Sequence, residues 1–120
     1  MLRVSALTTE TEIDLQGVNG NAASAAVGID CGAELVAFAD AIAYRKTEDL
    51  ADSRKRLLDV GGAEVVVDAA GVAANFQRMV RIADSTGIPV DDMEMEVGKE
   101  VRAALDLTRF ASAQNTLNPA

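Results

Sequence analysis

The sequence predicts an all-α protein, a helical bundle organised around one long helix. Between residues 64 and 91, apolar side chains recur every three or four positions, which is the spacing of one face of an α-helix. Apolar residues make up 49% of the chain but include only three Phe, one Tyr and no Trp, and the chain holds only two prolines. Helices that pack closely through small aliphatic side chains fit this composition better than a β-sheet does.

The 120 residues suffice for one domain with a single modest core. We expect residues 1–31 to form an irregular or partly helical segment, in which glycines and asparagines interrupt any regular element. Within it, residues 22–27 could form a short helix. Residues 32–113 are expected to form the helical domain, and residues 114–120 a flexible tail.

Two helices are predicted before the long one. The first covers residues 33–46. The second starts at Thr47 as its N-cap and ends at Gly61 and Gly62. Three basic residues crowd the later part of the second helix, at positions 54–56. They could form an anion-binding patch, but a solvated last turn that complements the helix dipole is the simpler interpretation.

The long helix carries an apolar stripe that is wider than a surface helix needs, so we expect it to be central and covered on more than one side. The stripe contains Val65, Ala69, Val72, Phe76, Met79 and Ala83. Gly71 inside this helix costs on the order of 1 kcal/mol relative to Ala, and close packing of a partner helix is the simplest compensation. Gly87 and Pro89 end the helix, and Asp91 or Asp92 is expected to cap a last one.

Charge and composition limit the classes of function. The net charge of −8 argues against nucleic acid or an anionic membrane as a partner. Neither a signal peptide nor a membrane-spanning run is recognisable, so a cytoplasmic protein is expected. With no histidine and one cysteine, the chain can form no internal disulfide and no cysteine-rich metal site, and it lacks the commonest metal ligand and general base. We therefore expect no metal and no cofactor.

Cys31 is the candidate catalytic nucleophile. It precedes Gly32 near the start of a predicted helix, where the helix dipole favours a thiolate. The negative charge of the neighbouring Asp30 disfavours the thiolate. No histidine is present to activate the thiol and no second cysteine to resolve an oxidised form. A buried or incidental cysteine is the simpler interpretation.

Asn75, Arg78 and Arg81 are the candidate ligand-binding residues. They follow one another at intervals of three on the long helix and so lie on neighbouring turns. The strip could hold an anionic ligand, with Phe76 and Met79 lining an apolar part, or an acidic residue of a partner helix. Alternatively, the two arginines pair with the many acidic residues of the chain.

Three stretches together resemble a known family. They are ELVAFADAI at residues 34–42, TEDLADSRKRLLDVGG at residues 47–62, and the string N-F-x-x-M-x-R-I-A-D-x-x-G-x-P-x-D at residues 75–91. The segment resembles the AhpD-like (carboxymuconolactone decarboxylase/alkylhydroperoxidase) superfamily, in particular the C-terminal half of its peroxidase-related members. This resemblance implies an all-helical fold that assembles into dimers, trimers or hexamers through helix faces.

Active members of that superfamily reduce peroxides with a C-x-x-C pair, a nearby histidine and an upstream glutamate. No position here matches that motif, because Cys31 has no partner cysteine and the chain has no histidine. The chain is then either a divergent member that lost catalysis or one that lacks the motif-bearing half. Whether it is an enzyme stays open.

Three hypotheses about function follow. The first is a non-catalytic AhpD-like protein that acts by self-assembly, as a homo-oligomer, or by partner binding. The second is a thiol-dependent peroxidase or antioxidant-type enzyme that uses Cys31. The third is a protein that binds a small anionic ligand through Arg78 or Arg81.

Overall fold

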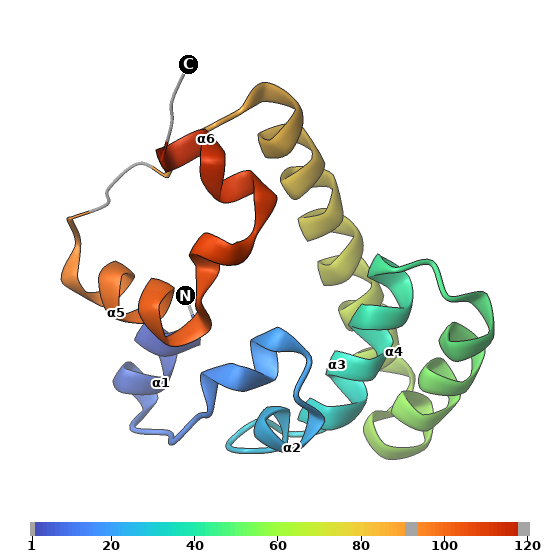
Figure 1. The fold of residues 1–120 in the computed structure, drawn as a ribbon. Coiled ribbons are helices and arrows are strands. Elements are labelled where there is room, and N and C mark those ends of the chain that lie inside the picture. The colour runs from blue at the N-terminus through green and yellow to red at the C-terminus, as the bar shows by residue number, and fades with distance from the viewer. Residues whose placement is uncertain (1, 91–93, 118–120) are drawn as a thin grey trace. The chain divides into compact units, whose positions relative to one another are not determined.

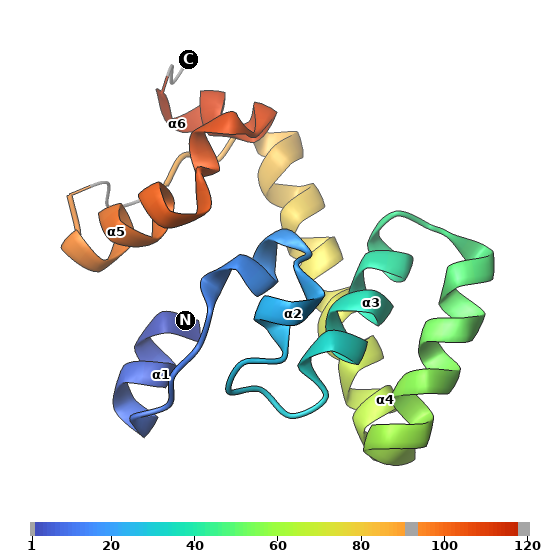
Figure 2. The ribbon, with the colours of Figure 1, turned by 60° about the horizontal axis from the view of Figure 1, so that its bottom comes forward.

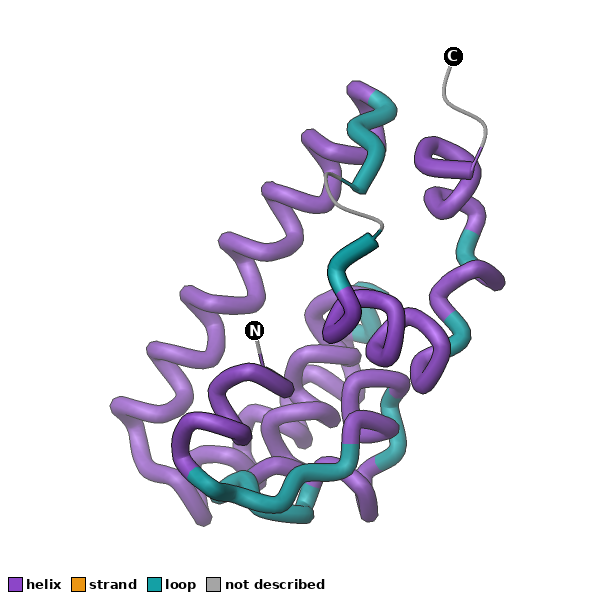
Figure 3. The backbone as a smooth tube through the Cα atoms, turned by 90° about the vertical axis from the view of Figure 1, so that its left-hand side faces the viewer, coloured by secondary structure: helices purple, strands orange, loops and turns teal. Residues whose placement is uncertain are grey.

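The computed structural model describes residues 2–90 and 94–117, and in these residues it contains helices and loops but no strand (Figure 3). The all-α prediction is confirmed. In chain order (Figure 1) the elements are α1 (Leu2–Thr9), the 3₁₀-helix η1 (Leu15–Asn19), α2 (Ala22–Ala25), α3 (Gly32–Ala43), α4 (Thr47–Thr86), α5 (Glu96–Leu105), the 3₁₀-helices η2 (Leu107–Arg109) and η3 (Ala111–Ala113), and α6 (Gln114–Leu117). None of the described helices is long and apolar enough to cross a membrane.

The chain divides into two compact units, Met1–Gln77 (unit 1) and Arg78–Ala120 (unit 2). The boundary falls inside α4. The expectation of one domain rested on the length of 120 residues, and the apolar stripe of residues 64–91 runs through this boundary without a break. Each unit is described separately below.

The core of unit 1 is small. Its buried apolar side chains are Ala6, Ala25, Phe38, Ala41 and Leu57. Helix α2 lies against both η1 and α3. The side chain of Asn21 caps α2 by accepting hydrogen bonds from the backbone N–H groups of Ala23 and Ser24, both at 3.1 Å. The predicted helix over residues 22–27 therefore exists, but it ends at Ala25.

Helix α4 is broken at Gly62, whose backbone has φ 81° and ψ 176°. These angles lie in a region that only glycine occupies readily, so the glycine ends one helical segment and lets the next begin. The predicted end of the helix that starts at Thr47, at Gly61 and Gly62, is confirmed. Figures 1 and 2 both show α3 alongside the two segments of α4.

The second segment of α4 is less covered than the sequence predicted. In unit 1, Val67 is 69% exposed, Val72 58% and Phe76 52%. A Cβ atom added at Gly71 would meet nothing within 4 Å among the described residues. Within unit 1, the expectation of a helix covered on more than one side is therefore not met, because these α4 side chains stay exposed.

Helix α4 ends as predicted at Gly87, which has φ 66°. The N–H of Ile88 donates to the carbonyl oxygen of Ala83 at 3.2 Å, the long hydrogen bond of a Schellman-type end. The proposed caps Asp91 and Asp92 lie outside the described residues. In unit 2, Leu105 is the buried side chain of α5.

Candidate functional site

An apolar groove lies between α3 and the second segment of α4, entirely within unit 1, and we refer to it as the α3–α4 groove. Its volume is about 610 Å³. Its lining residues are Leu35, Phe38, Ala39, Val65, Asp68, Ala69, Val72, Ala73 and Phe76. Helical periodicity explains the set, since the α4 members are separated by one, three or four residues and so share one side of the helix.

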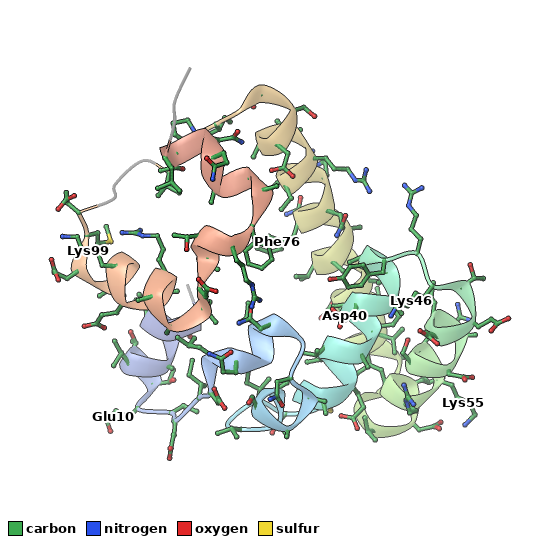
Figure 4. All side chains as sticks on the ribbon, viewed as in Figure 1. Glu10, Asp40, Lys46, Lys55, Phe76 and Lys99 are labelled. Carbon is green, nitrogen blue, oxygen red and sulfur yellow. The ribbon has the colours of Figure 1, made fainter. Side chains whose placement is uncertain are left out.

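The groove combines a buried floor with exposed walls. Phe38 is only 3% exposed and belongs to the core, whereas Val72 and Phe76 each keep more than half of their surface exposed. Figure 4 labels Phe76 on α4. Ala69 and Ala73 leave room for another backbone to approach closely. Among the described lining residues Asp68 alone is charged, so the groove suits an apolar occupant.

A polar cleft of about 260 Å³ lies on the other segment of α4, near the α3–α4 connection. Asp40 of α3 and Lys46 contribute to it, and Figure 4 shows both side chains. Lys46 Nζ lies 3.9 Å from Asp49 Oδ2 in an exposed ion pair, which contributes little to stability. Arg56 lies in the same cleft. Although acidic residues gather here, no group of side chains in the described part of the chain could hold a metal ion.

The three basic residues at positions 54–56 do not point to an anion site. Lys55 Nζ forms an ion pair with Asp59 Oδ2 at 2.7 Å on the exposed helix surface. This carboxylate raises the pKa of Lys55 through a hydrogen bond and through its charge. Arg56 instead lines the polar cleft together with Asp49 and Asp52. The carboxylates beside these side chains support the interpretation as a solvated helix surface.

Cys31 immediately precedes α3 and is half-buried. Its backbone adopts a left-handed conformation with φ 53°, and its carbonyl oxygen accepts a hydrogen bond from the N–H of Leu35 at 2.8 Å. Its side chain makes no capping hydrogen bond. The thiol does not line the groove or the cleft, so the structure brings no second functional group to it there.

Asn75, Arg78 and Arg81 are all exposed on α4. Asn75 belongs to unit 1, whereas Arg78 and Arg81 belong to unit 2. None of the three lines the groove or the cleft. Their role as an anion-binding strip stays a prediction.

The groove residues of α3 were not singled out as a site by the sequence. The wide apolar stripe of α4 was the sequence feature that could have indicated the groove. Its residues were instead expected to be buried inside the chain. Only the exposure of Val72 and Phe76 identifies that stripe as a surface. Comparisons of the chain with protein-family models, with curated proteins and with solved structures found no match.

Proposed function

We propose that the chain is an AhpD-like helical protein that acts by self-assembly, with the α3–α4 groove as the contact between two copies, and that it does not reduce peroxides. The observation that carries the proposal is the exposure of Val72 and Phe76 beside a buried aromatic floor. The motif string at residues 75–91 and the helical order before it support the family resemblance.

Covering this surface is energetically favourable. Fully burying a Val or Phe side chain stabilises a protein by about 1.5–3 kcal/mol, so burying the exposed halves of Val72 and Phe76 contributes about half of that for each. A second copy brings the same side chains, so each contact occurs twice in a two-fold dimer. The small residues Ala69 and Ala73 allow the two α4 helices to approach closely.

The charge pattern suits an antiparallel pairing of α4 with its copy. If Val72 lies at the two-fold axis, Asp68 of one copy lies opposite Phe76 of the other. The two Asp68 carboxylates are then separated by eight residue steps along the helix axis, about 12 Å. That distance exceeds the screening length at physiological salt, about 8 Å, so their repulsion is weak.

The chain lacks the chemical groups that peroxide reduction requires in the resembled family. The reaction in the resembled family requires two thiols and a histidine, whereas this sequence has one cysteine and no histidine. The half-buried Cys31 precedes α3, apart from the described groove lining. A lone thiolate can be oxidised once, but it has no partner within the chain to restore it.

Sedimentation velocity over a wide concentration range tests the proposal, with Val72→Glu as the disrupting variant and Val67→Glu as its matched control. Both valines are exposed on the same helix, but only Val72 lines the groove. A charge buried without a partner is strongly destabilising, so Val72→Glu is expected to weaken association at least tenfold while Val67→Glu does not. A wild-type chain that sediments as a monomer at every concentration would refute the proposal.

A further inference from the structure

Asp68 brings a carboxylate to the apolar α3–α4 groove. Its side chain is exposed in the single chain, where water solvates the charge. Val65 lies about one helical turn before it and Val72 about one turn after it, and both line the same groove. The carboxylate therefore borders the apolar surface that the proposed contact between two copies covers.

Assembly through the groove removes water from this carboxylate. In the antiparallel pairing of two α4 helices about Val72, Asp68 of one copy lies opposite Phe76 of the other. A phenyl ring has no N–H or O–H group to donate a hydrogen bond to the carboxylate, so it does not replace the lost water. Burial against an apolar group disfavours the charged form of a carboxyl group and favours the protonated form. Assembly therefore either buries a charge at a cost or takes up a proton.

The charged residues nearest to Asp68 in unit 1 are themselves acidic. The charged residues of α3 are Glu34 and Asp40, and neither is among the described lining residues of the groove. On α4, Glu64 lies about one turn before Asp68, and it too is outside the described lining. Negative charges nearby disfavour a further ionised carboxylate, so these three residues act in the same direction as the burial of Asp68.

The facing surface of the other copy is uncharged around Phe76. Asn75 and Gln77, on either side of Phe76 in the sequence, carry neutral amides. Arg78 follows Phe76 by two residues, which corresponds to a rotation of about 200° around the helix axis. Its Cα–Cβ bond therefore points away from the side of α4 that carries Phe76, and the pairing brings no arginine opposite Asp68.

We propose that Asp68 makes self-assembly through the α3–α4 groove depend on pH, so that association is weak near neutral pH and stronger in mild acid. This inference rests on the proposed function. If the assembled state binds more protons than the separate chains do, association strengthens as pH falls. A two-fold dimer contains Asp68 twice, so it can take up two protons and the effect occurs twice.

Sedimentation velocity of the wild type and Asp68→Asn at about pH 7.5 and about pH 5, both above the usual value for an aspartate of about 3.9, tests this inference. The wild type is expected to associate at least tenfold more tightly at the lower pH. Asp68→Asn keeps the shape of the side chain without its charge. At neutral pH it is expected to associate at least tenfold more tightly than the wild type, and its association should change less with pH.

Glu64→Gln is the matched control, because it removes the same charge from the same helix, about one turn away and outside the described groove lining. It is expected to keep the pH dependence of the wild type. A double variant locates the effect. Adding Val72→Glu to Asp68→Asn should cancel the gain in association, because Val72 lines the groove beside Asp68.

The outcomes separate this inference from the proposed function. A wild type that associates equally at both pH values would overturn the inference and leave self-assembly through the groove standing. The same pH dependence in the wild type and in Asp68→Asn would also overturn it, since the cause would then be the general loss of negative charge on an acidic chain. If both proteins stay monomeric at both pH values, the proposed function itself is refuted, and the inference with it.

Discussion

Gly32 lies directly against the carbonyl oxygen of Ala25, so closely that a Cβ atom at position 32 would overlap it. This contact sets the distance between α3 and α2. Gly32→Ala is expected to destabilise the protein by about 1–3 kcal/mol or more, because the backbone of one helix must move to admit the methyl group. Urea unfolding followed by circular dichroism measures the loss. Unchanged stability would mean that α2 does not pack against α3.

Gly71→Ala is expected to have the opposite effect. Position 71 lies in a helix, and a Cβ atom there meets no described atom within 4 Å. Replacing an exposed helical glycine with alanine stabilises a helix by up to about 1 kcal/mol. The same unfolding measurement on dilute protein checks this. If the variant is less stable, another backbone contacts position 71.

Gly62→Ala tests the break in α4. With φ 81° and ψ 176°, Gly62 has a conformation that costs other residues about 1–3 kcal/mol. Because no atom of the described residues lies within 4 Å of a Cβ atom at this position, any loss comes from backbone strain and not from a clash. Thermal unfolding of the variant gives the magnitude. A gain in stability would indicate that the two segments can join into one continuous helix.

The sequence predicted those features that depend on local backbone chemistry. The break at Gly62 and the left-handed end at Gly87 follow from glycine's freedom to adopt positive φ. The pairing of helices depends on contacts that a linear pattern does not encode. The apolar stripe of α4 therefore predicted an apolar helix face, but it did not predict that Val72 and Phe76 remain exposed.

Unit 2 contains a cavity of about 510 Å³, which was beyond prediction for a related reason. Arg102, Phe110 and Leu117 come from three different elements, α5, a loop and α6. No spacing in the sequence links them, and residues 114–120, which include Leu117, were expected to form a flexible tail. Only the arrangement of short helices in unit 2 places these side chains around one cavity.

Asp14 is expected to make the stability of unit 1 depend on pH in the acid range. The Ser24 hydroxyl and the Gln16 N–H, the latter at 2.9 Å, donate hydrogen bonds to its carboxylate and lower its pKa. A lowered folded-state pKa stabilises the protein above the unfolded value of about 4, and this stabilisation is lost as pH falls through the folded value. Asp14→Ala should therefore be less stable than the wild type at neutral pH, with a smaller difference in acid. A constant difference would exclude this linkage.

Cys31 is expected to support no catalytic peroxide turnover. Its thiol lies next to the start of α3, and the sequence has neither a histidine to take up its proton nor a second cysteine to displace water from a sulfenic acid. Peroxide consumption in the presence of a dithiol should therefore be equal for the wild type and Cys31→Ala. Alanine keeps the side chain small at this left-handed position, so unfolding curves of the two proteins control for structural damage. A faster wild type would establish Cys31 as a nucleophile and would refute the non-catalytic part of the proposed function, while leaving self-assembly through the α3–α4 groove to be decided by sedimentation.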